Sequence, residues 1–258
     1  MAVRAIDFSE FDGAFDQPPS LDRPKLLFVC TTPRSASHRL NRALFDLGLG
    51  VPAEYFNPSA QQLLVRWGLG SDLEAPDDLA TYWRELLRRR TRNGVFSMSL
   101  FGSQLRFLRR VLSPGDDAVF IHLQRRETAS QIASLLVLYE TKQPGETERS
   151  FSEIPGIREI SPRAIRVLHQ WIRLQNDKWR SFLATQPHLE ITTESFLADP
   201  AECLLKILAL GGWSGALGRV VQAVAGVTGS KAYATNAAIK QRLLRDFATT
   251  FAQLQDDR

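Results

Sequence analysis

The pattern of hydrophobic residues changes its period early in the chain. Leu26–Cys30, read LLFVC, is an unbroken apolar run of the kind found in strands buried on both faces. The next apolar residues recur with helical spacing, at Leu40, Ala43, Leu44 and Leu47. That spacing predicts an amphipathic helix that packs back on the sheet. The polar residues 31–37 between the two elements therefore predict a short strand-to-helix loop.

Further apolar runs predict strands at residues 95–100, 118–123 and 189–193. Segments with helical spacing separate these runs, including a long helix that begins near Arg163, and a single C-terminal helix is predicted at about 236–254. We expect an α/β fold of three layers, in which a mainly parallel central sheet is flanked by helices.

The domain organisation predicted from the chain is simple. Residues 1–24 read as an N-terminal arm that ends in a proline-rich stretch, and residues 25–258 as a single α/β domain. Residues 142–162 are polar and contain two Pro-Gly pairs, which predicts a long loop over a substrate site.

The first strand, loop and helix together predict an anion site. Ser37 is the expected N-cap, so the backbone N–H groups of residues 35–39 would lie at the positive end of the helix dipole. Arg34 adds a forked cation suited to phosphate or sulfate oxygens. An ordinary turn with a solvated arginine is an alternative of equal weight.

Two common phosphate-binding motifs do not match this loop. Residues 31–37 contain no Gly and no Lys, so the loop is not the G-x-x-x-x-G-K-[ST] motif of ATP- and GTP-binding proteins. Only three residues separate Cys30 from Arg34, which is too few for the Cys-x5-Arg cradle of a cysteine phosphatase. Cys30 is better interpreted as a small apolar strand residue.

Composition narrows the class of protein. The chain has 258 residues, 44% of them hydrophobic and 23% charged, enough for one large core. No apolar run reaches the roughly 18 residues of a membrane span, and the acidic N-terminal stretch does not resemble a signal peptide. Cys30 and Cys203 suggest neither a disulfide framework nor a zinc site. We therefore expect a cytoplasmic protein without stable membrane insertion and without a metal.

Arginine dominates the positive charge. The formal net charge is +4, and 26 of the 32 basic residues are Arg, a bias that suits phosphate-bearing ligands. Nucleic acid is the rival ligand, but the chain lacks nucleic-acid-binding signatures and its charge is spread along the sequence. We expect no nucleic-acid partner.

Two segments, TTPRSAS at 31–37 and VPAEYFNP at 51–58, resemble bacterial sulfotransferases of the trehalose 2-sulfotransferase type and, more loosely, the Nod-factor sulfotransferases. The resemblance implies a fold similar to nucleotide kinases and 3′-phosphoadenosine-5′-phosphosulfate as the sulfuryl donor. It also makes a homodimer a family-level expectation.

The family's TPRSGST loop, which holds the 5′-phosphosulfate, matches residues 32–38. The resemblance therefore assigns donor binding to Arg34, Ser35, Ala36, Ser37 and His38. Ala36 stands where the family has Gly, and its Cβ can obstruct close approach of the backbone to a phosphate. His38 replaces a Thr of the family, and Ser99 falls where the family often has a Lys.

The resemblance also indicates a general base. Glu54 lies in the family's EYF motif, so it would accept the proton of an attacking hydroxyl; by position alone a surface glutamate is the more common alternative. Tyr55 and Phe56 would line the acceptor pocket, where aromatic faces suit sugar rings. Packing in the core is an equal alternative for both.

A second motif, QRRETASQIAS, follows the strand at 118–123. Arg126 and Ser134 are eight residues apart, and a strand-end Arg with a Ser eight residues later holds the 3′-phosphate in sulfotransferases. The carboxyl edge of a parallel sheet is where ligands bind in such folds. His122, inside that strand, is predicted to be a hydrogen-bonded core residue.

These motifs together predict transfer of a sulfuryl group from 3′-phosphoadenosine-5′-phosphosulfate to a hydroxyl of a carbohydrate or glycolipid. Glu54 would be the base, and Arg34 would stabilise charge on the departing phosphate. Two alternatives stay open: a kinase-like phosphotransferase, which would need Mg and ATP, and a non-catalytic binding protein on a degenerate sulfotransferase fold. The identity of the acceptor does not follow from the sequence.

Overall fold

In the computed structural model, residues 13–18, 23–57, 60–69, 73–141, 159–228 and 234–256 are described. Within them, the central sheet has four strands in the order β2-β1-β3-β4, and every neighbouring pair is parallel. The strands are β1 (Lys25–Thr31), β2 (Val95–Phe101), β3 (Ala118–Gln124) and β4 (His188–Thr192). The predicted α/β fold with a parallel sheet is confirmed, and each predicted strand lies within a residue of its observed limits.

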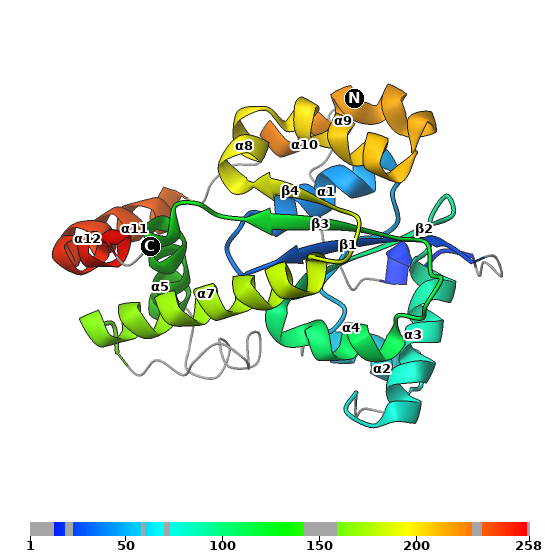
Figure 1. Ribbon diagram of the computed structural model, residues 1–258, viewed down its shortest axis with the longest axis horizontal. Helices are drawn as coiled ribbons and strands as arrows, with labels where there is room; N and C mark the ends of the chain where they lie inside the picture. The colour runs from blue at the N-terminus through cyan, green and yellow to red at the C-terminus, as the bar shows by residue number, and fades with distance from the viewer. Residues whose placement is uncertain are drawn as a thin grey trace.

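Helices cover both faces of this sheet (Figure 1). The helices between the first and third strands are α1 (Ser37–Leu47), α2 (Gln61–Arg66), α3 (Pro76–Arg90) and α4 (Leu105–Val111). Those that follow are α5 (Thr128–Thr141), α7 (Pro162–Leu183), α8 (Thr193–Ala198), α9 (Pro200–Gly211), α10 (Val220–Thr228), α11 (Ala234–Asp246) and α12 (Ala248–Asp256). The short 3-10 turns are η1 (Gly13–Phe15), η3 (Gly102–Gln104) and η4 (Ser214–Arg219).

The central strand β1 explains the first apolar run of the sequence. Leu27 and Val29 face a core shared with α1, α9 and α10, whereas Leu26, Phe28 and Cys30 face a second core shared with α3, α4 and α7. A strand between two layers of helices is apolar at every position, because both of its faces are buried.

A third core lies beyond the carboxyl ends of the strands. Ile132 and Leu136 of α5 pack there with Leu168 of α7, Leu243 of α11 and Phe251 of α12. The arrowheads of β1, β3 and β4 point toward this group of helices (Figure 1). The third core therefore places the C-terminal helices beside the sheet edge where the predicted site lies.

Two details of the predicted elements are wrong or lie outside the described residues. The single helix expected at about 236–254 is interrupted at Phe247, which separates α11 from α12. Phe247 still bonds back to Leu243 of α11, at 3.2 Å from N to O. Most of the loop predicted at 142–162, residues 142–158, lies outside the described residues.

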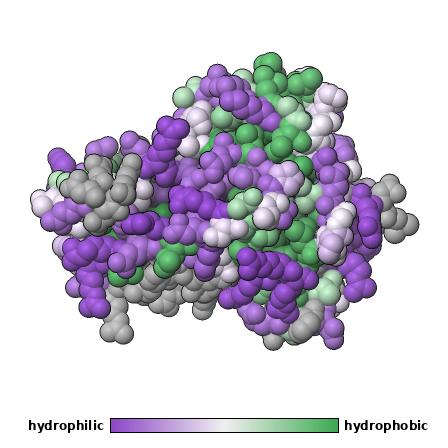
Figure 2. All heavy atoms as spheres, in the orientation of Figure 1, coloured by the Kyte–Doolittle hydropathy of each residue, from purple (hydrophilic) through white to green (hydrophobic). Residues whose placement is uncertain are grey.

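The surface adds one more observation. Hydrophobic side chains gather over α9 and α10 in the view of Figure 2, and the exposed ones in this region include Leu205, Leu217 and Val221. No helix in the described ranges combines the length and apolar character that a membrane crossing requires.

Candidate active site

The loop after β1 has an unusual backbone. Arg34 and Ala36 both have positive φ, 66° and 64°, although neither is glycine. Ala36 is the N-cap of α1, and its carbonyl oxygen accepts from the N–H of Arg39 at 3.0 Å. Ser37 was expected to be the N-cap, and that prediction is wrong: the left-handed residue Ala36 is the N-cap, so the helix starts one position earlier and Ser37 is its buried first residue.

Side chains from β1 fix the inner part of this loop. The Thr31 hydroxyl donates to the carbonyl of Leu123 on β3 at 2.8 Å and also contacts the Ser35 hydroxyl. The Ser35 hydroxyl donates to the Thr32 carbonyl at 2.7 Å. The turn is thus closed by hydroxyl groups rather than by glycine flexibility.

Donors from three other helices bind the loop's carbonyl oxygens. Trp179 Nε1 of α7 donates to Thr31 O at 2.9 Å, Gln131 Nε2 of α5 to Pro33 O at 2.7 Å, and Thr193 Oγ1 of α8 to Ser35 O at 2.8 Å. The loop carbonyls are thus held by other donors, and the N-terminus of α1, which is the positive end of the helix dipole, is the part of this loop suited to an anion.

The structure brings the two predicted motifs into contact. Arg34 Nε donates to Ser134 Oγ of α5 at 2.8 Å, although the two residues are 100 positions apart. Burial lowers the pKa of Arg34, the nearby Arg125 guanidinium lowers it further, and Glu54 raises it. Arg34 therefore lies within electrostatic reach of both a second cation and the proposed base.

The side chain of Arg125, at the end of β3, reaches the loop. Arg125 Nη1 donates to the Arg34 carbonyl at 3.0 Å, and Nη2 donates to Ser130 Oγ at 2.7 Å. Arg126 is exposed, and its backbone N–H donates to Glu194 of α8 at 3.1 Å. The spacing argument missed Arg125 because two adjacent arginines follow the strand and periodicity cannot say which one turns inward.

A third cation comes from the C-terminal helix α11. Lys240 Nζ lies 2.5 Å from Ser130 Oγ, on the same hydroxyl that Arg125 binds. Burial lowers the pKa of Lys240 to about 8, with Arg125 and Arg34 adding to the effect and Glu127 opposing it. No motif pointed to Lys240, since its contact depends on how α11 packs on α5.

Glu54 is a buried carboxylate, with 6% of its surface exposed. Asn57 Nδ2 donates to Glu54 Oε2 at 3.0 Å. The preceding carbonyl, of Ala53, accepts from the N–H of Ser99 on β2 at 2.9 Å, which ties this loop to the sheet. Asn57 holds the carboxylate in one orientation and is a site residue that the sequence analysis did not single out.

Tyr55 and Phe56 lie in the core. The Tyr55 hydroxyl donates to Val51 O at 2.5 Å, and its ring stacks on Phe96 with centroids 5.9 Å apart. Phe56 packs against Phe107 at 5.2 Å. These contacts fit the packing alternative: both rings, which follow Glu54 in the sequence, are buried in the core.

The positions that depart from the family pattern have different surroundings. Ser99 is buried, and its hydroxyl donates to Asn41 Oδ1 of α1 at 2.7 Å, so it joins β2 to the helix that follows the loop. His38 is exposed in the first turn of α1.

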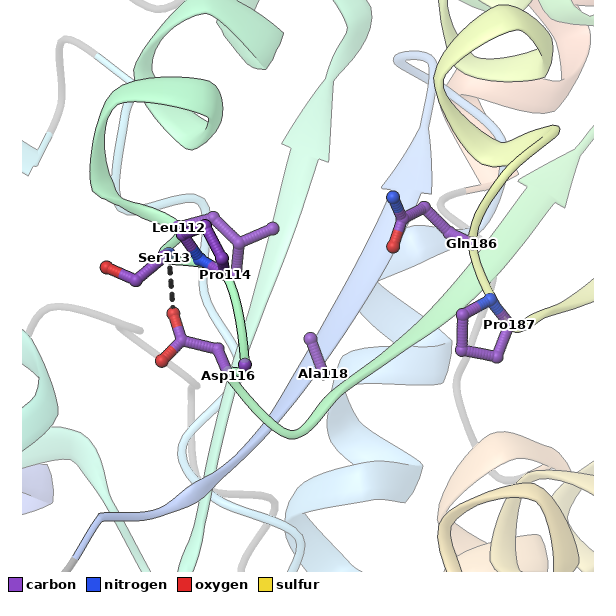
Figure 3. A pocket seen from close by; sticks show the side chains of 8 residues that line it. Leu112, Ser113, Pro114, Asp116, Ala118, Gln186 and Pro187 are labelled. Carbon is purple, nitrogen blue, oxygen red and sulfur yellow. Dashed lines mark hydrogen bonds between the residues drawn. The ribbon is translucent and has the colours of Figure 1, made fainter.

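A pocket of about 340 Å³ lies at the other end of the sheet (Figure 3). It is bordered by Ser113, Asp116 and Ala118 at the start of β3 and by Pro187 just before β4. Within it, Ser113 N donates to Asp116 Oδ2 at 2.7 Å. Its place at the amino ends of the strands separates it from the anion site at their carboxyl ends.

The described side chains suggest what this arrangement can do. Hydrogen bonds to Ser134 and Ser130 bring three cations together near the start of α1. The buried Glu54 carboxylate raises the pKa of one of them, Arg34. Such a site can hold a polyanion and take a proton from a neutral group next to it. No group of three or more His, Cys, Asp or Glu side chains that could hold a metal ion occurs in the described part of the chain.

Comparisons of the fold with solved structures and of the sequence with family models both return sulfotransferases. The solved sulfotransferase domain from the curacin biosynthetic pathway is 17% identical, with a TM-score of 0.48, over 72% of this chain and 73% of that one. The sulfotransferase domain from the Synechococcus PCC 7002 olefin synthase is 17% identical, with a TM-score of 0.47, over 90% and 98%. No curated protein sequence matches the chain. A family model described as Stf0 sulphotransferase matches residues 27–214, which is most of the chain, and the protein therefore belongs to the Stf0 sulfotransferase family.

Proposed function

We propose that this sulfotransferase moves a sulfuryl group from 3′-phosphoadenosine-5′-phosphosulfate to a hydroxyl of a carbohydrate or glycolipid acceptor. The observation that carries the proposal is the hydrogen bond of Arg34 to Ser134, which joins the two predicted donor-binding motifs. The buried Glu54 carboxylate raises the pKa of Arg34. Both observations support a base beside an anion site, the arrangement that transfer to a hydroxyl requires.

The residues present fit a donor with two anionic ends. Arg34 and the backbone of Ser35, Ala36, Ser37 and His38 form the proposed site for the 5′-phosphosulfate, because α1 begins there. Arg126 and Ser134 are the proposed residues for the 3′-phosphate. Ser134 supports this role by its contact with Arg34, while Arg126 lies exposed at the edge of the same motif.

The proposed reaction forms a bond between the acceptor oxygen and sulfur while the bond between sulfur and the phosphate oxygen of the donor breaks. Glu54 accepts the proton that the hydroxyl loses. Asn57 orients the Glu54 carboxylate. Arg34 and the loop N–H groups stabilise the negative charge that gathers on the departing phosphate, the effect that often contributes most to such catalysis.

The acceptor class, location and assembly state belong to the same proposal. We propose that Tyr55 and Phe56 contribute to the acceptor pocket by supporting it from the core, where both rings are buried. A cytoplasmic location is supported by Cys30 and Cys203, which are free, buried thiols as expected in a reducing compartment. A trehalose-type acceptor and a homodimer are proposed from the sequence resemblance.

The test replaces Glu54 by Gln, which keeps the shape and removes the charge. Turnover with labelled donor and a panel of glycans, followed by mass spectrometry, should fall about 10²- to 10⁴-fold, the usual contribution of a general base. Binding of adenosine 3′,5′-bisphosphate should stay close to wild type. Glu202→Gln, at an exposed ion pair on α9, is the matched control.

Different outcomes would contradict different parts of the proposal. Unchanged turnover in Glu54→Gln would remove Glu54 from the mechanism. A wild-type protein that is stabilised by ATP–Mg but not by adenosine 3′,5′-bisphosphate in a thermal-shift measurement would instead be a phosphotransferase.

A further inference from the structure

We propose that Lys240 is a direct ligand of a phosphate group of the bound nucleotide, held together with Arg125 and Ser130, so that anion binding depends on the C-terminal helix α11. The inference rests on the proposed function and adds to it a binding residue from outside the loop and strand-end motifs. The ligand class is a phosphate monoester dianion.

Ser130 accepts hydrogen bonds from two cations. Arg125 Nη2 and Lys240 Nζ donate to the same Ser130 oxygen, at 2.7 and 2.5 Å. A serine hydroxyl has two acceptor lone pairs and one proton to donate. With both lone pairs engaged by cations, the remaining O–H of Ser130 is a donor, and it stands between two positively charged groups.

The balance of charge carries the second step. Arg125 lowers the pKa of both Arg34 and Lys240, and Arg34 also lowers the pKa of Lys240. Glu127 and Glu194 favour the charge on Arg125, but Glu194 also accepts from the N–H groups of Arg126 and Glu127, both at 3.1 Å. The Glu194 carboxylate is therefore held at the start of α5, and the Arg125 and Lys240 side chains meet at Ser130, where they can bind an anion together.

The packing of α11 carries the third step. Leu243, one turn after Lys240, is buried in the third core with Ile132 and Leu136 of α5. Helix α11 packs against α5 near the carboxyl ends of the strands (Figure 1). These apolar contacts hold α11 in place, and its packing positions Lys240 next to Ser130.

The state of Lys240 makes the proposal measurable. With a pKa of about 8, Lys240 is roughly half protonated at pH 8 before a ligand binds. The groups that set this value are Arg125 and Arg34, which disfavour the proton, and Glu127, which favours it. A phosphate dianion beside Lys240 favours the protonated form of the lysine, so binding should be accompanied by proton uptake. The phosphate itself, with a second pKa of about 6, does not titrate in this range.

The experiment is calorimetric titration with adenosine 3′,5′-bisphosphate at pH 8, in buffers that differ in ionisation enthalpy. Wild type should take up about half a proton on binding. Lys240→Met should take up almost none and should bind about 10- to 100-fold more weakly, the loss expected for a hydrogen bond to a charged group. Lys240→Arg should keep most of the affinity yet show no proton uptake, since arginine does not titrate near pH 8.

Controls separate binding from structure. Lys206→Met, at an exposed pair with Glu202, should behave as wild type. Adenosine 5′-monophosphate identifies the phosphate: loss with the bisphosphate alone assigns Lys240 to the 3′-phosphate, and equal loss with both nucleotides assigns it to the 5′-phosphate. Either result supports the proposal.

Two results would overturn it. If Lys240→Met binds the bisphosphate as tightly as wild type, or if wild type binds without proton uptake, Lys240 serves only the packing of α11. A wild-type protein that binds no adenosine nucleotide would contradict the proposed donor instead. If Lys240→Met also has a lowered melting temperature, Lys240→Arg decides the question, because it keeps the charge and should bind without proton uptake.

Discussion

Ala36 holds a left-handed backbone at the start of α1, with φ of 64°. A residue with a Cβ adopts this region at a cost of roughly 1–2 kcal/mol, whereas glycine adopts it freely. The hydroxyl contacts of Thr31 and Ser35 and the carbonyl contact of Thr193 hold the turn despite this cost. The loop thus keeps its shape without glycine, but at a cost in free energy.

Ala36→Gly should therefore raise the stability of the protein. Relief of the strain exceeds the added entropy of the unfolded chain, and the net gain should be about 0.5–1 kcal/mol. Chemical denaturation measures it. Ala43→Gly, at a buried position in the middle of α1, is the control and should lose stability by about 1 kcal/mol or more. A loss in Ala36→Gly would show that the Cβ packs favourably and that the turn is unstrained.

The same scale shows the limit of reading single residues from spacing. Arg34 and Ser134 were chosen from the sequence, and the structure joins them by a hydrogen bond. Arg125 and Lys240 were not chosen. Their roles depend on the direction of a side chain after a strand and on the placement of a distant helix, neither of which has a local signature.

At the scale of elements, the N-terminal arm packs on three helices through a few residues. Phe15 contacts Phe45 of α1 edge-on, with ring centroids 5.5 Å apart. Asp16 Oδ1 pairs with Arg90 of α3 at 2.8 Å, and Asp16 Oδ2 accepts from Trp67 Nε1 at 3.1 Å. The guanidinium of Arg90 is fully buried and lies 5.9 Å from the Tyr55 ring centroid. The arm therefore supplies charge to a buried cation behind the Glu54 loop.

Asp16→Asn should destabilise the protein by about 3 kcal/mol, because it leaves the buried charge of Arg90 without this carboxylate. Urea denaturation measures the loss. Asp117→Asn, at an exposed pair with Lys25, is the control and should change stability by less than about 1 kcal/mol. Adding Arg90→Met to Asp16→Asn should recover part of the loss, since no charge then remains buried. A small effect of Asp16→Asn would mean that other contacts of Arg90 suffice.

At the scale of the whole molecule, the sheet carries a buried histidine as predicted. His122 on β3 has no exposed surface, and its Nδ1 lies 3.1 Å from Gln124 Nε2. The amide nitrogen can only donate, so Nδ1 accepts and the neutral ring carries its proton on Nε2. Burial lowers the pKa of His122 to about 4, with added repulsion from Arg180 and His188.

Stability should consequently fall as the pH is lowered from about 6.5 to about 4. In that window the unfolded chain binds the proton and the folded protein does not, so acid favours unfolding. The contribution is lost progressively and amounts to at most about 3 kcal/mol. Denaturation at several pH values compares wild type with His122→Gln, whose slope should be shallower. Equal slopes in wild type and His122→Gln would show that His122 does not control acid stability.

The strands, most helices and the approximate place of the proposed anion-binding loop can be predicted from the sequence. Burial on both faces of β1 and the helical spacing of Leu40 and Leu44 follow from local periodicity, which a chain carries in its own order of residues. Glu54 was identified only through its resemblance to a family motif.

How those parts combine depends on the packing of the folded protein. The contact of Arg34 with Ser134, the inward turn of Arg125 and the arrival of Lys240 join segments that are far apart in sequence. The physical reason is that such contacts are set by the packing of α5 and α11 in the third core, where many apolar residues act together. Spacing along one segment does not encode the distance between two packed segments.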